Sequence, residues 1–99
     1  MNYLLVVDMQ VDFITGSLGS DLAAAIVPNV LKEIKNFDGR TIFTRDTHYN
    51  DYLNTREGKN LPIPHCIKGS DGWQICDKIQ QLIDNSANNG EKSSYYYVG

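Results

Sequence analysis

The stretch Tyr-Leu-Leu-Val-Val-Asp at residues 3–8 decides the fold class. A short continuous apolar run with a charged residue directly after it is typical of a β-strand that is buried on both faces. Such strands occur in parallel sheets whose faces are covered by helices. We therefore expect a first strand over residues 3–7, ending at Asp8.

The next segment predicts a helix and a second strand. Apolar side chains recur at the helical spacing i, i+3, i+4 and i+7, at Val27, Val30, Leu31 and Ile34. Pro28 fits the first helical turn, where its missing N–H has no intrahelical partner to lose. The helix should end near Asn36, because Asp38-Gly39 favours a turn and residues 41–44 favour a strand. A strand, a helix and a strand in this order form two parallel strands with a right-handed crossover.

A long loop and a second helix follow. No hydrophobic period runs through residues 45–72, which hold both histidines and several carboxylates, so we interpret this loop as functional. A helix capped by Ser70 or Asp71 should come next. Its apolar stripe would carry Ile75, Ile79 and Leu82, with Cys76 and Ile83 beside it. Residues 85–94 are a polar connection, and residues 95–98 have strand propensity.

These elements predict an α/β fold, the N-terminal part of a doubly wound parallel sheet with flanking helices. A sheet of three strands is small and has open edges on both sides, so the chain looks unfinished. We interpret residues 1–99 as one partial, truncated domain. Self-association through the open edges is expected, because an unpaired strand is a template for another chain.

The composition fits one small domain. The chain has 99 residues, of which 41% are hydrophobic, and this length excludes two domains. Twelve acidic against nine basic residues leave no basic face for phosphate contacts, so no nucleic acid partner is expected. No apolar run approaches the roughly 20 residues of a membrane helix, and we expect a cytoplasmic protein without membrane contact. Cys66 and Cys76 are expected as free thiols.

Two carboxylates follow the predicted strands. Asp8 comes directly after the first strand, and Asp46 follows the second strand by one residue. Ligands of open parallel sheets bind beyond the carboxyl ends of the strands, so neighbouring strands would place both carboxylates on one rim. A structural role for Asp8, as a helix cap or in a loop ion pair, fits its position equally well.

The loop after the second strand offers metal ligands. Asp46 and His48 lie two residues apart, and an extended backbone points such residues to one face. Glu57 and His65 lie further along the same loop. Carboxylates and imidazoles suit Zn²⁺, Mn²⁺ or Fe²⁺ and leave positions open for water or substrate. For an Asp-x-His spacing taken by itself, an ordinary surface histidine is the commoner explanation.

Longer motifs around these residues resemble a known family. Residues 6–13, Val-Val-Asp-Met-Gln-Val-Asp-Phe, followed by Gly-Ser-Leu at 16–18, resemble the opening motif of the isochorismatase-like cysteine hydrolases. Residues 44–48 and 61–70 resemble the metal loop of that family. The resemblance runs from residue 3 to about 84 and is greatest to the nicotinamidase branch. It implies hydrolysis of a small aromatic amide such as nicotinamide by a cysteine nucleophile, with an aspartate, a lysine and a divalent metal, zinc before iron or manganese.

The resemblance implies roles for individual residues. Asp8 matches the aspartate that takes the thiol proton, and Phe13 matches an aromatic residue of the substrate pocket; Phe13 fits ordinary core packing equally well without the resemblance. The positions that match metal ligands are Asp46, His48, Glu57 and His65. Lys92 is the candidate for the catalytic lysine, in a setting that departs from the family pattern.

The family's nucleophilic cysteine lies in a turn well after the third strand, beyond the end of this sequence. Cys66 and Cys76 do not match it and are expected to be inert. Our first hypothesis is therefore the N-terminal half of a nicotinamidase-like hydrolase, inactive by itself. The alternative is a non-catalytic remnant that binds a metal or a partner. A third possibility, isochorismatase-type hydrolysis of a vinyl ether, does not use the metal ligands of this loop.

Overall fold

Three parallel strands form one sheet in the computed structural model, which describes residues 2–88 and 95–99. Strand β1 (Tyr3–Val6) pairs with β2 (Arg40–Thr44), and β2 pairs with β3 (Tyr95–Val98), so that the strand order is β1-β2-β3. The parallel α/β architecture predicted from the sequence is confirmed, and so is the third strand.

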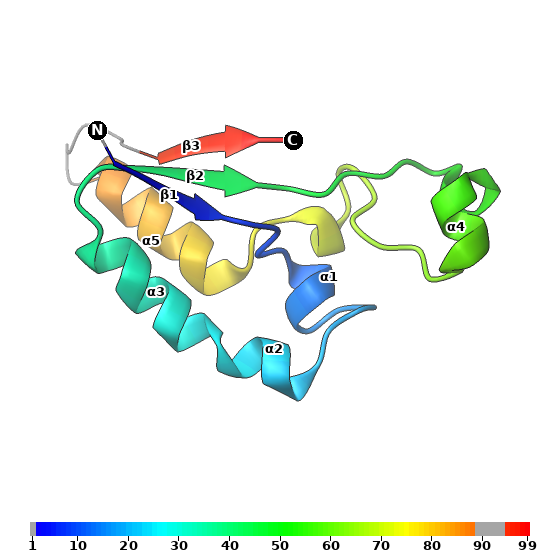
Figure 1. Cartoon of the computed structure of the whole chain (residues 1–99), viewed down its shortest axis with the longest axis horizontal. Coiled ribbons are helices and arrows are strands. Elements are labelled where there is room, and N and C mark those ends of the chain that lie inside the picture. Colours follow the sequence, from blue (N-terminus) through cyan, green and yellow to red (C-terminus); the bar gives the residue numbers. More distant parts are fainter. Residues whose placement is uncertain (1, 89–94) are drawn as a thin grey trace.

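Helices connect the strands and lie on one side of the sheet. Two short helices, α1 (Val11–Ile14) and α2 (Asp21–Ala25), lead into α3 (Val27–Asn36), and α5 (Asp77–Asn88) precedes β3. Helices α3 and α5 lie side by side beneath the same face of the sheet (Figure 1). The sequence predicted α3 up to its end at Asn36, but it gave no sign of α1 or α2, because four or five residues are too few to show a helical period.

The long segment between β2 and α5 contains three short elements. These are a 3₁₀ turn η1 (Tyr52–Asn54), helix α4 (Arg56–Asn60) and a second 3₁₀ turn η2 (Asp71–Trp73). The part with α4 projects beyond the end of the sheet (Figure 1), and the molecule measures 43 × 25 × 24 Å. The segment is therefore ordered by local turns and not by a continuous hydrophobic face.

The last helix differs from the sequence prediction at both ends. It begins at Asp77, and neither Ser70 nor Asp71 caps it, because η2 and an extended stretch come between. Ile75 precedes the helix and pairs with Gln10 in an isolated β-bridge. The helix continues to Asn88, into residues 85–94, which the sequence predicted to be a connection.

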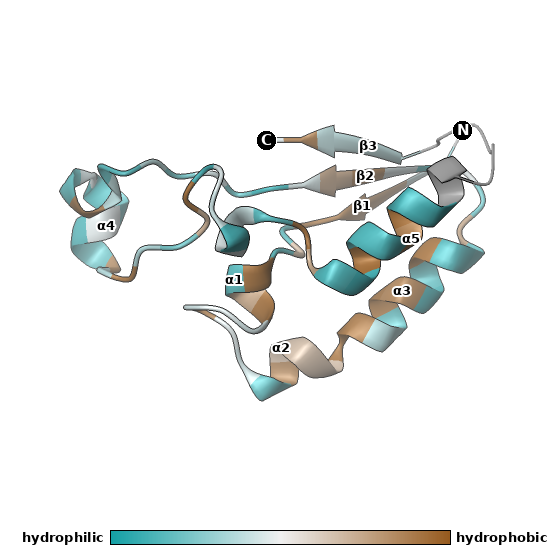
Figure 2. Cartoon of the chain, turned by 180° about the vertical axis from the view of Figure 1, so that it is seen from behind, coloured by the Kyte–Doolittle hydropathy of each residue, from teal (hydrophilic) through white to brown (hydrophobic). Residues whose placement is uncertain are grey.

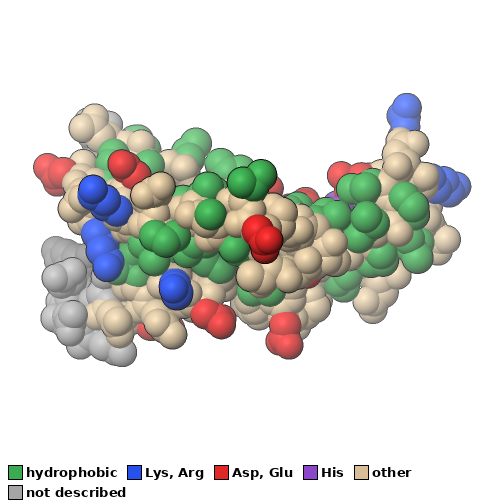
Figure 3. Space-filling view, turned by 90° about the horizontal axis from the view of Figure 1, so that it is seen from below, with side chains coloured by type: hydrophobic (Ala, Val, Ile, Leu, Met, Phe, Trp, Pro, Cys, Tyr) green, Lys and Arg blue, Asp and Glu red, His purple; other side chains and the backbone are tan. Residues whose placement is uncertain are grey.

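The hydrophobic core lies between the sheet and helices α3 and α5. Its buried members are Val6, Met9, Ile14, Val27, Ile34, Phe43, Ile75, Cys76, Ile79 and Ile83. Figure 2 shows hydrophobic residues along the strands and on stripes of both helices. From below, the helical side shows hydrophobic side chains between scattered charges of both signs (Figure 3). Both cysteines are free, as predicted, and both are buried.

The opposite face of the sheet is open within the described residues, which corrects the expectation of a first strand buried on both faces. Tyr3, Leu5 and Val7 are 56%, 60% and 61% exposed, whereas Val6 is 6% exposed. Side chains alternate across a strand, and α3 and α5 cover only the face to which Val6 points. No helix in the described part of the chain is long and apolar enough to cross a membrane.

Candidate metal centre

The carboxyl ends of β1 and β2 meet at one rim, where Asp8 is held against the end of β2. The Asp8 N–H donates to the carbonyl oxygen of Thr44 at 3.2 Å and to Thr44 Oγ1 at 3.1 Å. Thr44 Oγ1 in turn donates to Asp8 Oδ1 at 2.9 Å. Asp8 has a φ of 52°, a left-handed conformation that aspartate tolerates better than most residues.

Asp46 and His48 point to one place, as the spacing of two residues predicted. His48 Nε2 lies 2.9 Å from Asp46 Oδ2. The backbone of His48 is held by a short parallel bridge to Ile67. In this bridge the His48 N–H donates to the carbonyl of Cys66, and the Lys68 N–H donates to the carbonyl of His48, both at 2.9 Å. This pairing brings the two halves of the loop together.

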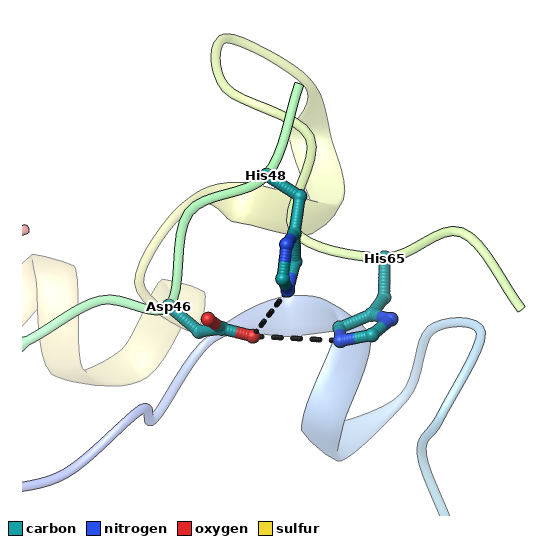
Figure 4. Close-up of side chains that lie close together, drawn as sticks. All are labelled: Asp46, His48 and His65. Atoms are coloured by element: carbon teal, nitrogen blue, oxygen red, sulfur yellow. Dashed lines mark hydrogen bonds and ion pairs between the residues drawn. The ribbon is translucent and has the colours of Figure 1, made fainter. Parts of the chain in front are cut away.

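His65 joins Asp46 and His48 from the second half of the loop. It is 4% exposed, and its Nε2 lies 3.4 Å from Asp46 Oδ2. His65 Nδ1 lies 2.8 Å from the carbonyl oxygen of Ile63. Because a carbonyl only accepts, Nδ1 carries the hydrogen, and in the neutral ring Nε2 presents its lone pair to Asp46. The donor atoms of Asp46, His48 and His65, here called the metal centre, lie within 4.8 Å of one another (Figure 4).

Glu57 reaches the metal centre from its outer side. Its Oε2 lies 3.0 Å from His48 Nε2, and its side chain is 57% exposed. Glu57 stands in the first turn of α4, which Thr55 caps by accepting a hydrogen bond from the Gly58 N–H at 3.1 Å. The structure thus places Glu57 against His48, outside the compact group of three.

Two aromatic side chains border the histidines. The ring of Phe13, which is half-buried, lies 5.5 Å from that of His65. Tyr52 is 1% exposed, and its ring centroid lies 4.8 Å from His48 and 5.1 Å from His65. Burial raises the pKa of Tyr52, and the carboxylate of Glu57 adds to this effect. The Tyr52 phenol therefore remains a hydrogen-bond donor, which it uses toward the Leu61 carbonyl at 2.8 Å.

Gln10 and Asp12, which sequence reasoning did not single out, contact the loop of the metal centre. Gln10 is 0% exposed; its Nε2 donates to the carbonyls of Asp46 at 2.9 Å and Trp73 at 2.7 Å. Its Oε1 accepts from the Asp46 N–H at 2.8 Å. Asp12 Oδ2 accepts from the Cys66 N–H at 2.7 Å. The available signal was the polar Gln10 between the apolar Met9 and Val11, a few residues after the first strand.

Both thiols lie in environments that keep them protonated. Burial raises the pKa of Cys66 to about 12, and the carboxylates of Asp46 and Asp12 add to this effect. Burial also raises the pKa of Cys76. Lys92, the candidate for the catalytic lysine, lies outside the described residues.

The chemistry of the donor set fits a divalent cation. Two imidazole nitrogens and two carboxylates face one another, so electron-rich atoms converge where a cation would satisfy them together. The two negative charges of Asp46 and Glu57 balance a charge of two. This mixture of nitrogen and oxygen ligands suits zinc, iron or manganese.

Solved structures resemble this chain over nearly its whole length. The N-carbamoylsarcosine amidase of Thermoplasma acidophilum is 28% identical with a TM-score of 0.71, covering 96% of this chain and 49% of that chain. The pyrazinamidase of Pyrococcus horikoshii, solved in complex with zinc, is 26% identical with a TM-score of 0.60. The match covers 98% of this chain and 69% of the pyrazinamidase. The nicotinamidase of Bacillus subtilis shares the fold at 24% identity and a TM-score of 0.65, covering 96% and 53%.

The chain thus spans about half the length of the amidase from Thermoplasma acidophilum and of the nicotinamidase from Bacillus subtilis. Among curated proteins no match was found. A family model described as the isochorismatase domain matches residues 2–92, and this match shows that the chain belongs to the isochorismatase family.

Proposed function

We propose that this chain supplies the metal centre and the general base of a nicotinamidase-like amidohydrolase, which converts a small aromatic amide such as nicotinamide to its acid. The observation that carries the proposal is the convergence of Asp46, His48 and His65 at the carboxyl end of the sheet. Asp8 stands at the same rim through its bonds to Thr44. In parallel sheets this rim is where ligands bind.

The similar structures support hydrolysis of a carbon–nitrogen bond. The N-carbamoylsarcosine amidase and the pyrazinamidase, at 28% and 26% identity, are both named as amidases, and the pyrazinamidase was solved with zinc. We therefore place zinc first among the divalent metals, with iron and manganese as alternatives. Hydrolysis of a vinyl ether, the isochorismatase-type reaction, is a weaker proposal because it gives the metal centre no role.

The residues of this chain have distinct proposed tasks. Thr44 donates to Asp8 Oδ1, so a thiol proton would be taken by the other oxygen of this carboxylate. Phe13 would lie against the ring of an aromatic amide beside His65. Asp46, His48 and His65, with Glu57 at the outer side, would hold the metal ion. A bound divalent ion supplies Lewis acidity and orients water or substrate. Lys92 is the proposed lysine partner of Asp8.

The nucleophile is proposed to come from outside these 99 residues. A catalytic thiol needs a lowered pKa, whereas burial raises the pKa of Cys66 to about 12 and also raises that of Cys76. The chain by itself should therefore bind metal but not hydrolyse the amide. Metal or partner binding without catalysis, the second candidate function, is what this chain would show in isolation.

Metal analysis of the purified chain tests the first part of the proposal. We expect one divalent ion per chain, lost in His48→Ala and His65→Ala and weakened in Asp46→Asn. Asp38→Asn is the matched control, because Asp38 is an exposed carboxylate in the turn before β2. The metal centre would be refuted by a chain that takes up no zinc, iron or manganese, or by uptake that His48→Ala leaves intact.

An ammonia-release assay with nicotinamide tests the second part. We expect no turnover from the zinc-loaded chain, because losing a nucleophile removes nearly all of the rate enhancement. Turnover by this chain that a chelator abolishes would contradict the assignment of the nucleophile to other residues. A matched Cys66→Ser variant would then show whether Cys66 carries the reaction.

A further inference from the structure

The turn after β1 holds both halves of the loop that carries the metal centre. We propose that Gln10 and Asp12 are positioning residues, which fix Asp46 and His65 in their ligand geometry before an ion binds. This inference rests on the metal centre proposed above. Neither Gln10 nor Asp12 belongs to the group of ligands, so each would act through its hydrogen bonds.

Gln10 fixes the backbone of Asp46 from two sides. Its amide oxygen accepts from the Asp46 N–H at 2.8 Å, and its amide nitrogen donates to the Asp46 carbonyl at 2.9 Å. The second hydrogen of the nitrogen goes to the carbonyl of Trp73 at 2.7 Å. With all three bonds made in a side chain that is 0% exposed, the amide has a single orientation. The backbone of Asp46 is therefore fixed, and its carboxylate is directed at His48.

Asp12 fixes the residue that follows His65. Its Oδ2 accepts from the Cys66 N–H at 2.7 Å, and Cys66 has a φ of 49°. This left-handed conformation is unfavourable for a residue other than glycine, and a hydrogen bond to a carboxylate offsets part of that cost. Gly16 and Gly72 leave room for the carboxylate, since a Cβ at either position would overlap Asp12. The conformation at Cys66 sets the direction from which the His65 ring approaches.

The two positioning residues, Gln10 and Asp12, lie in one short segment of the chain. Gln10 directly precedes α1 and Asp12 lies in its first turn, while Asp46 and His65 come from opposite halves of the loop. A single rigid turn thus determines the separation of two ligands. Removing the hydrogen-bond partners of metal ligands typically lowers metal affinity about 10- to 100-fold, because the ligands are then no longer preorganised.

The test measures metal affinity and ligand geometry without any activity. Zn²⁺ affinity is measured by competition with a chromophoric chelator, and the Co²⁺ absorption spectrum reports the coordination geometry. The variants are Asp12→Ala, Asp12→Asn, which keeps an oxygen to accept from Cys66, and Gln10→Met, which keeps the length of the side chain. Ile34→Ala is the control, because Ile34 is a 2% exposed core residue on α3, outside the loop. Thermal unfolding of each metal-free variant shows that it is folded.

We expect Asp12→Ala and Gln10→Met to weaken Zn²⁺ binding by about 10- to 100-fold and to change the Co²⁺ spectrum. Asp12→Asn should recover most of the affinity, and Ile34→Ala should bind as the original chain does despite its lower stability. If Gln10→Met fails to fold, the comparison of Asp12→Ala with Asp12→Asn decides whether the inference holds.

Two results would overturn this inference while leaving the proposed metal centre intact. These are unchanged affinity in folded Asp12→Ala, and an equal loss in Ile34→Ala, which would mark the effect as general destabilisation. A chain of original sequence that binds no Zn²⁺ would overturn the proposed function together with this inference, so the two failures are distinguishable.

Discussion

Among the described residues no strand pairs with the outer edge of β1, and this open edge predicts that the chain associates weakly with itself. The Arg40 N–H donates to the carbonyl of Asn2, and the Asp8 N–H donates to Thr44, so the even-numbered residues of β1 face β2. By alternation, the N–H and C=O groups of residues 3, 5 and 7 point away from the sheet. A second copy could pair there with its own β1, antiparallel and centred on Leu5. No charged residue interrupts residues 3–7 to prevent this pairing.

The exposed side chains set the strength of this association. Tyr3, Leu5 and Val7 are 56–61% exposed on the open face, and each would bury a large part of that surface against the second copy. At about 100 Å² for each side chain, a dimer removes about 600 Å² from water, which is about 15 kcal/mol before costs. The loss of translational and rotational freedom on association costs about 10 kcal/mol of this stabilisation. The remaining 5 kcal/mol corresponds to a dissociation constant on the order of 100 μM.

Sedimentation velocity over concentrations that bracket this value is the assay. Leu5→Lys should abolish the dimer, because it places a charge at the centre of the pairing while the side chain stays in solvent in the monomer. Leu22→Lys is the matched control, since Leu22 is 83% exposed on α2. The reasoning is refuted if the original chain remains monomeric throughout, or if Leu22→Lys weakens association as much as Leu5→Lys does.

Three further results are expected. At pH 8, iodoacetamide should modify Cys66 and Cys76 far more slowly in the folded chain than in urea, because burial raises both pKa values; similar rates in the two states would contradict this. Because the folded pKa of Cys66 is about 12, above its unfolded value, the contribution of this thiol to the stability of the metal-free chain should be complete below about pH 8.5 and be lost as pH rises toward 12, which urea unfolding at several pH values measures. Ile79→Ala should cost about 2 to 5 kcal/mol of unfolding free energy, since Ile79 is 0% exposed, and Ile26→Ala, at a 48% exposed position, should cost far less in the same denaturation experiment.

The sequence predicted the elements whose pattern is local. Helix α3 follows from the spacing of its apolar residues and the turn at Asp38-Gly39, and β2 follows from its β-branched and aromatic residues. The exposure of Leu5 and Val7 was not predictable from the apolar run, because a run of this kind does not show which elements pack on either face. The start of α5 was misplaced because Ile75 continues the helical spacing while it pairs with Gln10 instead.

The candidate site shows the same division between local and long-range information. The two-residue spacing of Asp46 and His48 already places both on one face of an extended segment. His65 reaches them through backbone pairing between the two halves of the loop, which no periodic pattern encodes. Gln10 escaped notice because its partners lie far away in the sequence, and only the fold reveals that its side chain is fully buried.

The proposed metal binding and the proposed bond cleavage have different structural requirements. Gln10 and Asp12, the proposed positioning residues, hold the backbone of Asp46 and of Cys66 by hydrogen bonds within the described residues, so the proposed metal binding rests on contacts that this chain itself makes. Cleavage needs in addition a thiolate within reach of Asp8, and burial makes Cys66 a poor source of one. A preorganised centre binds its ion whether or not a nucleophile is present, because the cost of ordering the ligands was met when the chain folded. Loss of metal affinity in Asp12→Ala would therefore report on the folded loop itself, independently of catalysis.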